Sequence, residues 1–88
     1  MAGIDLVITV TTTQAVILGS NPARRYVLLV NDGNEIIYLG MGKPAEVNRG
    51  IRLNSGGGNY EINLTNPFFE SIHAIAAANT SPLAVTER

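Results

Sequence analysis

The 88-residue chain has no cysteine, no tryptophan and a single histidine, His73. Without cysteine it has no disulfide framework, no thiolate metal site and no thiol nucleophile. One histidine per chain cannot build a multi-histidine metal centre. We therefore expect no metal and no other cofactor. We also expect so small a domain to gain stability by associating with other subunits.

Charged residues are scarce as well. They make up 15% of the chain, and the formal net charge is −1, whereas typical soluble domains contain about 25% charged residues. Electrostatic binding of nucleic acid requires a basic face, and the chain as a whole is not basic. We interpret the basic residues considered for such a face as scattered surface charges: Arg24, Arg25, Lys43, Arg49 and Arg52. We therefore expect protein partners and no nucleic acid.

Long apolar runs are missing too. No run approaches the ~20 residues that a membrane span requires. The first ten residues, MAGIDLVITV, lack the basic segment and the long apolar core of a secretory signal. We therefore expect no secretory signal and no membrane partner.

No pattern of catalytic residues is found. His73 is the one candidate general base, and it lies in an apolar segment with Ser71 on the same face of an extended strand. A catalytic histidine needs a nucleophile and an orienting acid within reach, so we predict a structural or interface histidine. The seven acidic residues are dispersed, which gives no support to paired acid–base chemistry or to a calcium site. An enzyme is not expected.

Period-two alternation and β-branched residues dominate the chain, and helix signals are nearly absent. The predicted strands are Asp5–Val10, Gln14–Leu18, Arg24–Asn31, Glu35–Leu39, Ile51–Leu53, Tyr60–Leu64, Phe69–Ala77 and Leu83–Thr86. About eight short strands at this spacing are typical of a sandwich or small barrel. We predict an all-β, jelly-roll-like β-sandwich forming a single domain over 1–88.

Two local features depend on this assignment. Asp32-Gly33 separates the third and fourth predicted strands, and both residue types tolerate the positive φ of tight hairpin turns, so we predict a β-hairpin there. Its first strand is apolar on both faces, so we expect it to be central and covered on both sides, either within the sandwich or by another subunit.

A helix over Ser71–Ala78 remains open, because SIHAIAAA is rich in helix formers. A short helical turn at Ala45–Val47 is also expected.

Three stretches together carry a family resemblance: the arginines before YVLLVNDGNEIIYLG, then GIRLNSGGGNYEI, and the closing AIAAANTSPLAVTE. This order resembles a group of small bacteriophage virion proteins of the capsid-decoration or cement type, and the similarity covers roughly Asn21 to Glu87. It implies a β-sandwich that binds other virion proteins in several copies at the particle surface, after synthesis in the host cytoplasm. In such proteins an N-terminal segment often contacts the neighbouring subunit, and by this analogy we expect 1–18, which lie outside the similarity, to supply an N-terminal strand or arm that does so. The resemblance carries over no catalytic residues.

We therefore expect a non-enzymatic virion structural protein that binds and stabilises the head shell. Its expected partners are the major capsid protein or other virion proteins. A homo-oligomer is expected too, with a trimer favoured, although a dimer and a chain that is monomeric until bound also fit. The predicted contact residues are Ile4, Leu6 and Ile8 in the first strand, Lys43, Glu46 and Arg49 in the long loop, and Gly56, Gly57 and Gly58 at a turn.

The alternative is a carbohydrate- or host-surface-binding module of a phage tail fibre or spike. Such modules usually offer stacked aromatic rings beside polar groups. This alternative predicts an exposed platform formed by Tyr38 and Tyr60.

Overall fold

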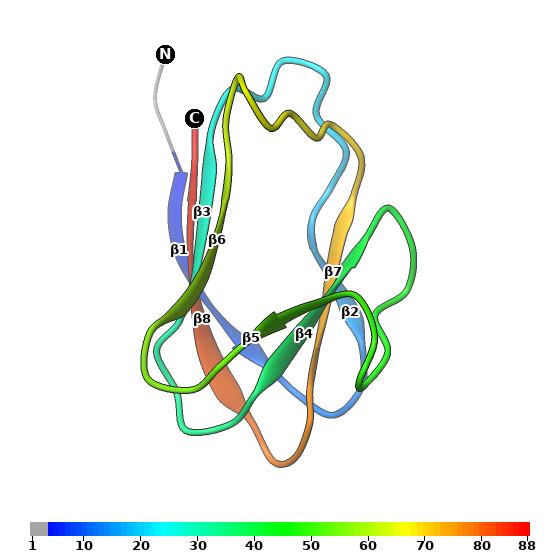
Figure 1. Ribbon diagram of the computed structural model, residues 1–88, viewed down its shortest axis with the longest axis vertical. Coiled ribbons are helices and arrows are strands. Elements are labelled where there is room, and N and C mark those ends of the chain that lie inside the picture. Colours follow the sequence, from blue (N-terminus) through cyan, green and yellow to red (C-terminus); the bar gives the residue numbers. More distant parts are fainter. Residues whose placement is uncertain (1–3) are drawn as a thin grey trace.

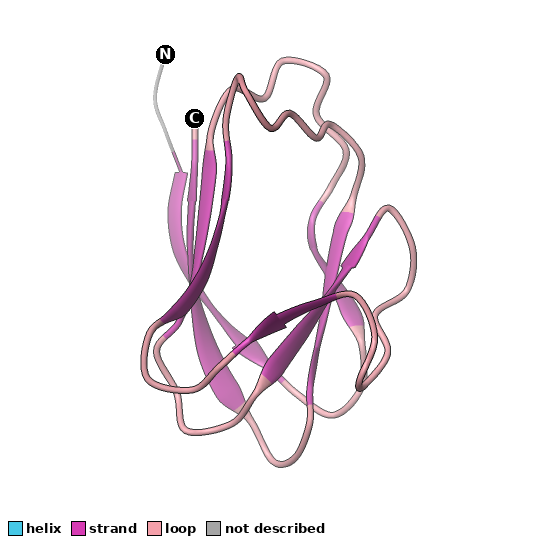
Figure 2. Cartoon of the chain, in the orientation of Figure 1, coloured by secondary structure: helices cyan, strands magenta, loops and turns pink. Residues whose placement is uncertain are grey.

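The computed structural model describes residues 4–88, and Ile4 by its backbone alone. Eight strands form two sheets that pack face to face (Figure 1). They are β1 (Ile4–Val10), β2 (Ala15–Leu18), β3 (Val27–Asn31), β4 (Ile37–Met41), β5 (Ile51–Leu53), β6 (Gly58–Ile62), β7 (Ile72–Ala76) and β8 (Ser81–Glu87). The described chain contains no helix (Figure 2). The helix alternative at 71–78 and the helical turn at 45–47 are therefore wrong.

The strand order identifies the architecture. Sheet A has the order β1-β8-β3-β6 and sheet B the order β2-β7-β4-β5, and all pairings are antiparallel. The chain changes sheet at every connection except the one between β4 and β5. Eight strands wound in this way between two sheets form a jelly roll. The predicted all-β, jelly-roll-like sandwich is confirmed.

The predicted hairpin around Asp32-Gly33 is wrong. Its two strands, β3 and β4, belong to different sheets, and neither Asp32 nor Gly33 has a positive φ. The buried Asn31 side chain determines the crossing instead. Its Nδ2 donates to the carbonyls of Glu35 and Leu53, at 2.6 and 3.0 Å, and its Oδ1 accepts from the Gly33 N–H and the Ser81 hydroxyl. All the hydrogen-bonding capacity of the amide is thus used to hold the chain between the sheets.

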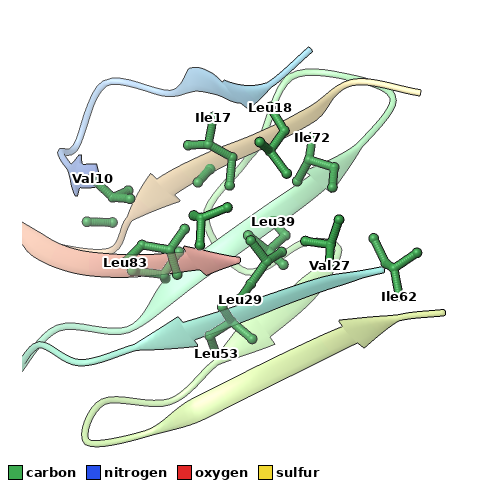
Figure 3. Packing of buried hydrophobic residues seen from close by; sticks show 14 residues of the cluster. Val10, Ile17, Leu18, Val27, Leu29, Leu39, Leu53, Ile62, Ile72 and Leu83 are labelled. Atoms are coloured by element: carbon green, nitrogen blue, oxygen red, sulfur yellow. The ribbon is translucent and has the colours of Figure 1, made fainter. Parts of the chain in front are cut away.

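The core lies between the sheets and takes alternate residues from their strands (Figure 3). Its members are Val10, Ile17, Leu18, Val27, Leu29, Ile37, Leu39, Leu53, Ile62, Ile72, Ala74, Ala76, Leu83 and Val85. The face predicted for β7, with Ile72, Ala74 and Ala76 together, is the buried one. The expected central position of the strand before Asp32 is also confirmed, because β3 lies between β8 and β6.

Strand β6 ends earlier than its alternation predicts. The sequence pattern continues to Leu64, but the strand stops at Ile62 and Leu64 is 77% exposed. Asn63 explains the difference, because its side-chain oxygen accepts hydrogen bonds from the N–H groups of Thr65 and Asn66, at 2.9 and 3.0 Å. An asparagine that binds the backbone just beyond itself makes a turn, and here that turn replaces further strand pairing.

Candidate interaction surfaces

The loop over 42–50 covers the outer face of sheet B. Tyr38 points away from the core, yet it is only 6% exposed, and its hydroxyl donates to Asn48 Oδ1 at 3.0 Å. Ala45 is buried as well. A side chain at Gly40 would overlap the backbone of Lys43 and Ala45, so glycine allows the loop to lie directly on the strand. The outer face of β4, which points away from the core, is therefore covered by a loop of the same chain.

This loop carries three of the predicted contact residues, Lys43, Glu46 and Arg49. All three side chains are exposed, and the one ion pair found within residues 4–88 involves none of them. The backbone beneath them is fixed, because the Arg49 N–H donates to the Glu46 carbonyl and the Ala45 N–H donates to Gln14 Oε1 at 3.3 Å. The loop thus presents charges of both signs from a backbone held by hydrogen bonds.

The glycine turn, Gly56 to Gly58, is bound to the rest of the molecule rather than projecting freely. The Gly56 N–H donates to the Gly33 carbonyl at 3.0 Å, and the Gly57 N–H donates to the Asn31 carbonyl at 2.8 Å. Gly56 and Gly57 have φ values of 74° and 117°, which favour glycine. The turn therefore meets the β3–β4 crossing. Of its three predicted contact residues, Gly56 is exposed, whereas Gly57 and Gly58 are half-buried.

The N-terminal strand β1 forms one edge of sheet A, next to β8. Ile4, Leu6 and Ile8 pair with Glu87, Val85 and Leu83 of β8 in an unbroken register. Leu6 and Ile8 share the inward face with their buried partners, and Ile8 packs against the core. Leu6 is nevertheless 44% exposed, and Val7 on the outer face is 74% exposed. The edge therefore leaves apolar surface open on both faces.

The three predicted contact regions do not converge on one site. Strand β1 lies at the edge of sheet A, whereas the loop over 42–50 covers the outer side of sheet B (Figure 1). The glycine turn lies at the crossing between β3 and β4. Whether these residues touch a partner stays a prediction.

Sequence reasoning missed an apolar row on the outer face of sheet A. Val7, Ala84 and Val30 lie side by side across β1, β8 and β3, because Ala84 pairs with both valines. Ala84 and Val30 are half-buried. No segment of 4–88 covers this face in the way that the loop over 42–50 covers sheet B. The apolar residues on both faces of β3 already indicated that a second apolar face exists. The sequence did not show which face of the strand the rest of the chain leaves uncovered.

Just before β3, Tyr26 is near Glu61 of β6. The interaction of its hydroxyl with the Glu61 side chain, followed by desolvation, raises the pKa of Tyr26 above its usual value of 10.0. The phenol is therefore uncharged at neutral pH. It adds a hydrogen-bonding group, but no charge, to the margin of the face.

The closest approach to a catalytic arrangement involves His73. Its Nδ1 lies 3.0 Å from Gln14 Oε1, and its Nε2 lies 3.2 Å from Ser71 Oγ. Because the same Gln14 oxygen accepts from the Ala45 N–H, Nδ1 carries the proton and Nε2 accepts from the serine hydroxyl. The order of groups is that of a nucleophile, a base and an orienting group. These contacts join β7, the residue before β2 and the covering loop. Gln14 was not foreseen.

An open cavity of about 620 Å³ lies elsewhere on the molecule. It is lined by Pro22, Ala23, Arg24, Arg25 and Arg88. None of these residues belongs to the His73 cluster. Within 4–88, no group of three or more histidine, cysteine or acidic residues is placed to hold a metal ion.

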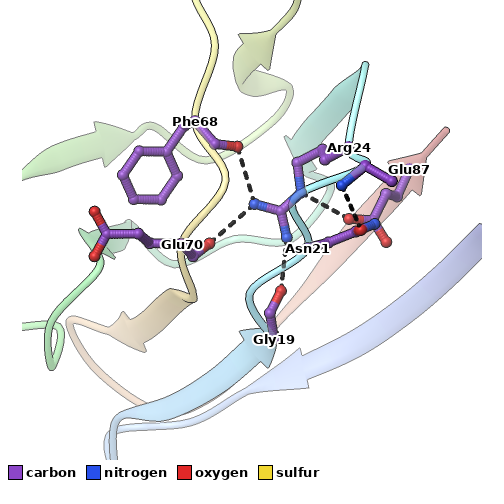
Figure 4. Close-up of polar contacts among 7 residues, drawn as sticks. Gly19, Asn21, Arg24, Phe68, Glu70 and Glu87 are labelled. Carbon is purple, nitrogen blue, oxygen red and sulfur yellow. Dashed lines mark hydrogen bonds and ion pairs between the residues drawn. The ribbon is translucent and has the colours of Figure 1, made fainter.

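Arg24 is not a surface charge, contrary to the prediction. It is 3% exposed, and its Nε donates to Glu87 Oε2 at 2.7 Å (Figure 4). Its Nη1 donates to the Phe68 and Glu70 carbonyls, and its Nη2 donates to the Gly19 carbonyl. One guanidinium thus connects the end of β8 with two loops. These hydrogen bonds hold the fold together.

The predicted platform of Tyr38 and Tyr60 is not formed. The two residues belong to β4 and β6, which lie in opposite sheets. Tyr38 is covered by the loop over 42–50, and Tyr60 packs against the core while its hydroxyl accepts from Asn66 Nδ2 at 3.1 Å. Sequence alternation placed each ring on a strand, but it gave no information on which strands share a sheet.

Comparison with known proteins gives no relative. No protein-family model matches the chain, and no match was found among curated proteins or among solved structures. Among the described residues, no helix is long and apolar enough to span a membrane.

Proposed function

We propose that the chain is a non-enzymatic structural protein of a bacteriophage particle, which decorates the head shell and stabilises it through protein–protein contacts. The observation that carries the proposal is the open apolar surface of sheet A, consisting of the Val7–Ala84–Val30 row and the edge of β1. Exposed apolar surface of this kind marks protein interaction sites. The assignment to a virion comes from the sequence resemblance over Asn21 to Glu87.

The proposed mechanism is burial of this surface against the major capsid protein or another virion protein. A standard interface removes about 800 Å² from each partner, which is roughly one-sixth of the 4981 Å² surface of this chain. A contact limited to the apolar row and one edge is smaller and therefore weak on its own. Repetition over a lattice, or among several copies of the chain, multiplies weak contacts into stable attachment.

The test is to titrate the purified chain onto capsids that lack it, counting the copies bound per particle and recording the rupture temperature. We expect saturation at a lattice-sized copy number together with a higher rupture temperature. Val30→Glu, which places a charge in the apolar row, should weaken binding by about tenfold or more. Ala78→Glu adds the same charge in the exposed β7–β8 connection and should bind as the unchanged chain does.

Two outcomes would contradict the proposal. Binding of only a handful of copies, or none, would exclude a decoration role and direct attention to the tail. Equal binding by the Val30→Glu and Ala78→Glu variants would exclude the apolar row as the contact, provided that both melt at the temperature of the unchanged chain.

A further inference from the structure

The sandwich has four edge strands, and three of them carry features that prevent pairing with another strand. Strand β2 has four residues and a register irregularity between Val16 and Leu18. Strand β5 has three residues, with the exposed Arg52 at its centre. Strand β6 begins at Gly58, carries the exposed Glu61 and ends in the Asn63 turn. Short length, irregular register and charge are the usual means of protecting a free edge.

Strand β1 has no comparable protection. It is seven residues long, and its register with β8 runs from Ile4 to Val10 without a bulge. Asp5 is its only charged residue, and it contains no proline, lysine or glycine. The large apolar residues Leu6 and Val7 are 44% and 74% exposed. A long, regular and apolar free edge is a template for a further strand.

We propose that β1 pairs antiparallel with β1 of a second copy of this chain, around a two-fold axis at Val7. In a two-fold contact, residue i lies opposite residue j and residue j lies opposite residue i. Because opposite residues share a face of the sheet, i and j must be both odd or both even. The register centred on Val7 is the one that pairs all seven residues.

The strand is self-complementary in that register. Val7 lies opposite Val7 of the second copy, Leu6 opposite Ile8, and Asp5 opposite Thr9. No charge meets a like charge, whereas a register centred on Asp5 would place two carboxylates together, which is unfavourable. This absence of repulsion is why a second copy, rather than an unrelated strand, is the occupant that we propose.

The pairing would also cover the free edge of β1, while the outer face of the Val7–Ala84–Val30 row stays open. The exposed Leu6 would pack against Ile8 of the second copy on the inward side. On the outer side, the two Val7 side chains would join the two Val7–Ala84–Val30 rows into one strip. The proposal does not require the virion function, since it concerns the purified chain alone. It predicts a dimer, whereas the sequence favoured a trimer.

The register is tested by single-cysteine variants, because the chain has no cysteine of its own. In Val7→Cys, the two cysteines would lie directly opposite, with Cα atoms about 4.5–5.5 Å apart, within the range of a disulfide. Mild oxidation should convert most of the protein to a covalent dimer. In the matched control Thr9→Cys, the two cysteines would be displaced by four residues, about 13 Å, and should not crosslink efficiently.

A second measurement is the solution mass as a function of concentration, by sedimentation. Val7→Lys sets two lysines opposite each other and should raise the dimer dissociation constant by about tenfold or more. Thr9→Lys sets a lysine opposite Asp5 of the second copy and should leave association unchanged or strengthen it. Both sites are exposed strand positions, so both variants should retain the fold.

Two results would overturn the pairing proposal. A chain that is monomeric or trimeric at all concentrations excludes the two-fold pair. Equal crosslinking of Val7→Cys and Thr9→Cys excludes this register. Failure of capsid binding with normal crosslinking would reject the proposed function and leave the pairing intact.

Discussion

At the scale of single residues, Arg24 is the buried charge on which several segments depend. Its guanidinium binds Glu87 and three backbone carbonyls, so four donors are used within the fold. A charge this deeply buried is tolerated because it is paired and its donors are satisfied. Its removal would leave Glu87 without its partner and free the carbonyls that it holds.

Arg24→Ala should destabilise the chain by about 3–5 kcal/mol, because one partner of a buried ion pair is lost. Arg25→Ala, at the exposed neighbouring position, should cost no more than about 0.5 kcal/mol. Urea unfolding of the two variants measures the difference. Arg24→Met combined with Glu87→Leu should recover part of the loss, since it leaves no unpaired charge. If Arg24→Ala and Arg25→Ala unfold alike, the network is not a stabilising one.

The sequence did not reveal this residue. Two consecutive arginines at the start of a strand are indistinguishable, by pattern, from two surface charges. The distinction depends on the carbonyls of Gly19, Phe68 and Glu70, which come from segments that only the folded chain brings together. Gln14 was missed for the same reason.

At the scale of elements, alternation predicted the strands well, because each strand buries one face and the period of two is local. Connectivity was predicted less well. The Asp32-Gly33 dipeptide favours a hairpin locally, but the buried Asn31 amide binds the chain in a crossing between the sheets. The closing strand was predicted to start at Leu83, whereas β8 begins at Ser81 and includes Pro82. The Pro82 carbonyl accepts from the Asp32 N–H, so the nitrogen of Pro82 points to the same side, just beyond the last pair of β3 and β8.

The crossing itself is testable through its glycine. A side chain at Gly33 would overlap the hydroxyl of Ser81, which is buried and bound to Asn31. Gly33→Ala should therefore destabilise the chain by about 1–3 kcal/mol, as overpacking usually does. That corresponds to a fall in Tm of roughly 5–20 °C.

Gly19→Ala is the matched control for the crossing. An added methyl at Gly19 meets nothing within 4 Å, and the residue lacks a positive φ. This variant should be neutral, or slightly stabilising because the unfolded chain loses freedom. Equal melting temperatures for Gly33→Ala and Gly19→Ala would show that the crossing is not tightly packed.

At the scale of the whole molecule, the two outer faces of the sandwich differ. The loop over 42–50 closes the face of sheet B, with Tyr38 of β4 buried beneath it and Ala45 of the loop itself buried as well. The face of sheet A keeps its apolar row, and β1 leaves its edge without protection. The sequence anticipated that the two-faced β3 needs a second cover. It did not show which segment or subunit covers the second face of β3, because that depends on which sheet the long loop packs against.

An association through this open side should make thermal stability depend on concentration. If two folded copies pair and unfolded chains do not, mass action stabilises the folded state as the protein concentration rises. We expect the Tm of the unchanged chain to increase over a hundredfold range of concentration, and that of Val7→Lys to increase less over the same range. Calorimetry across that range measures both. A constant Tm for both chains would mean that the edge of β1 stays free in solution, and its cover would then have to come from a different protein.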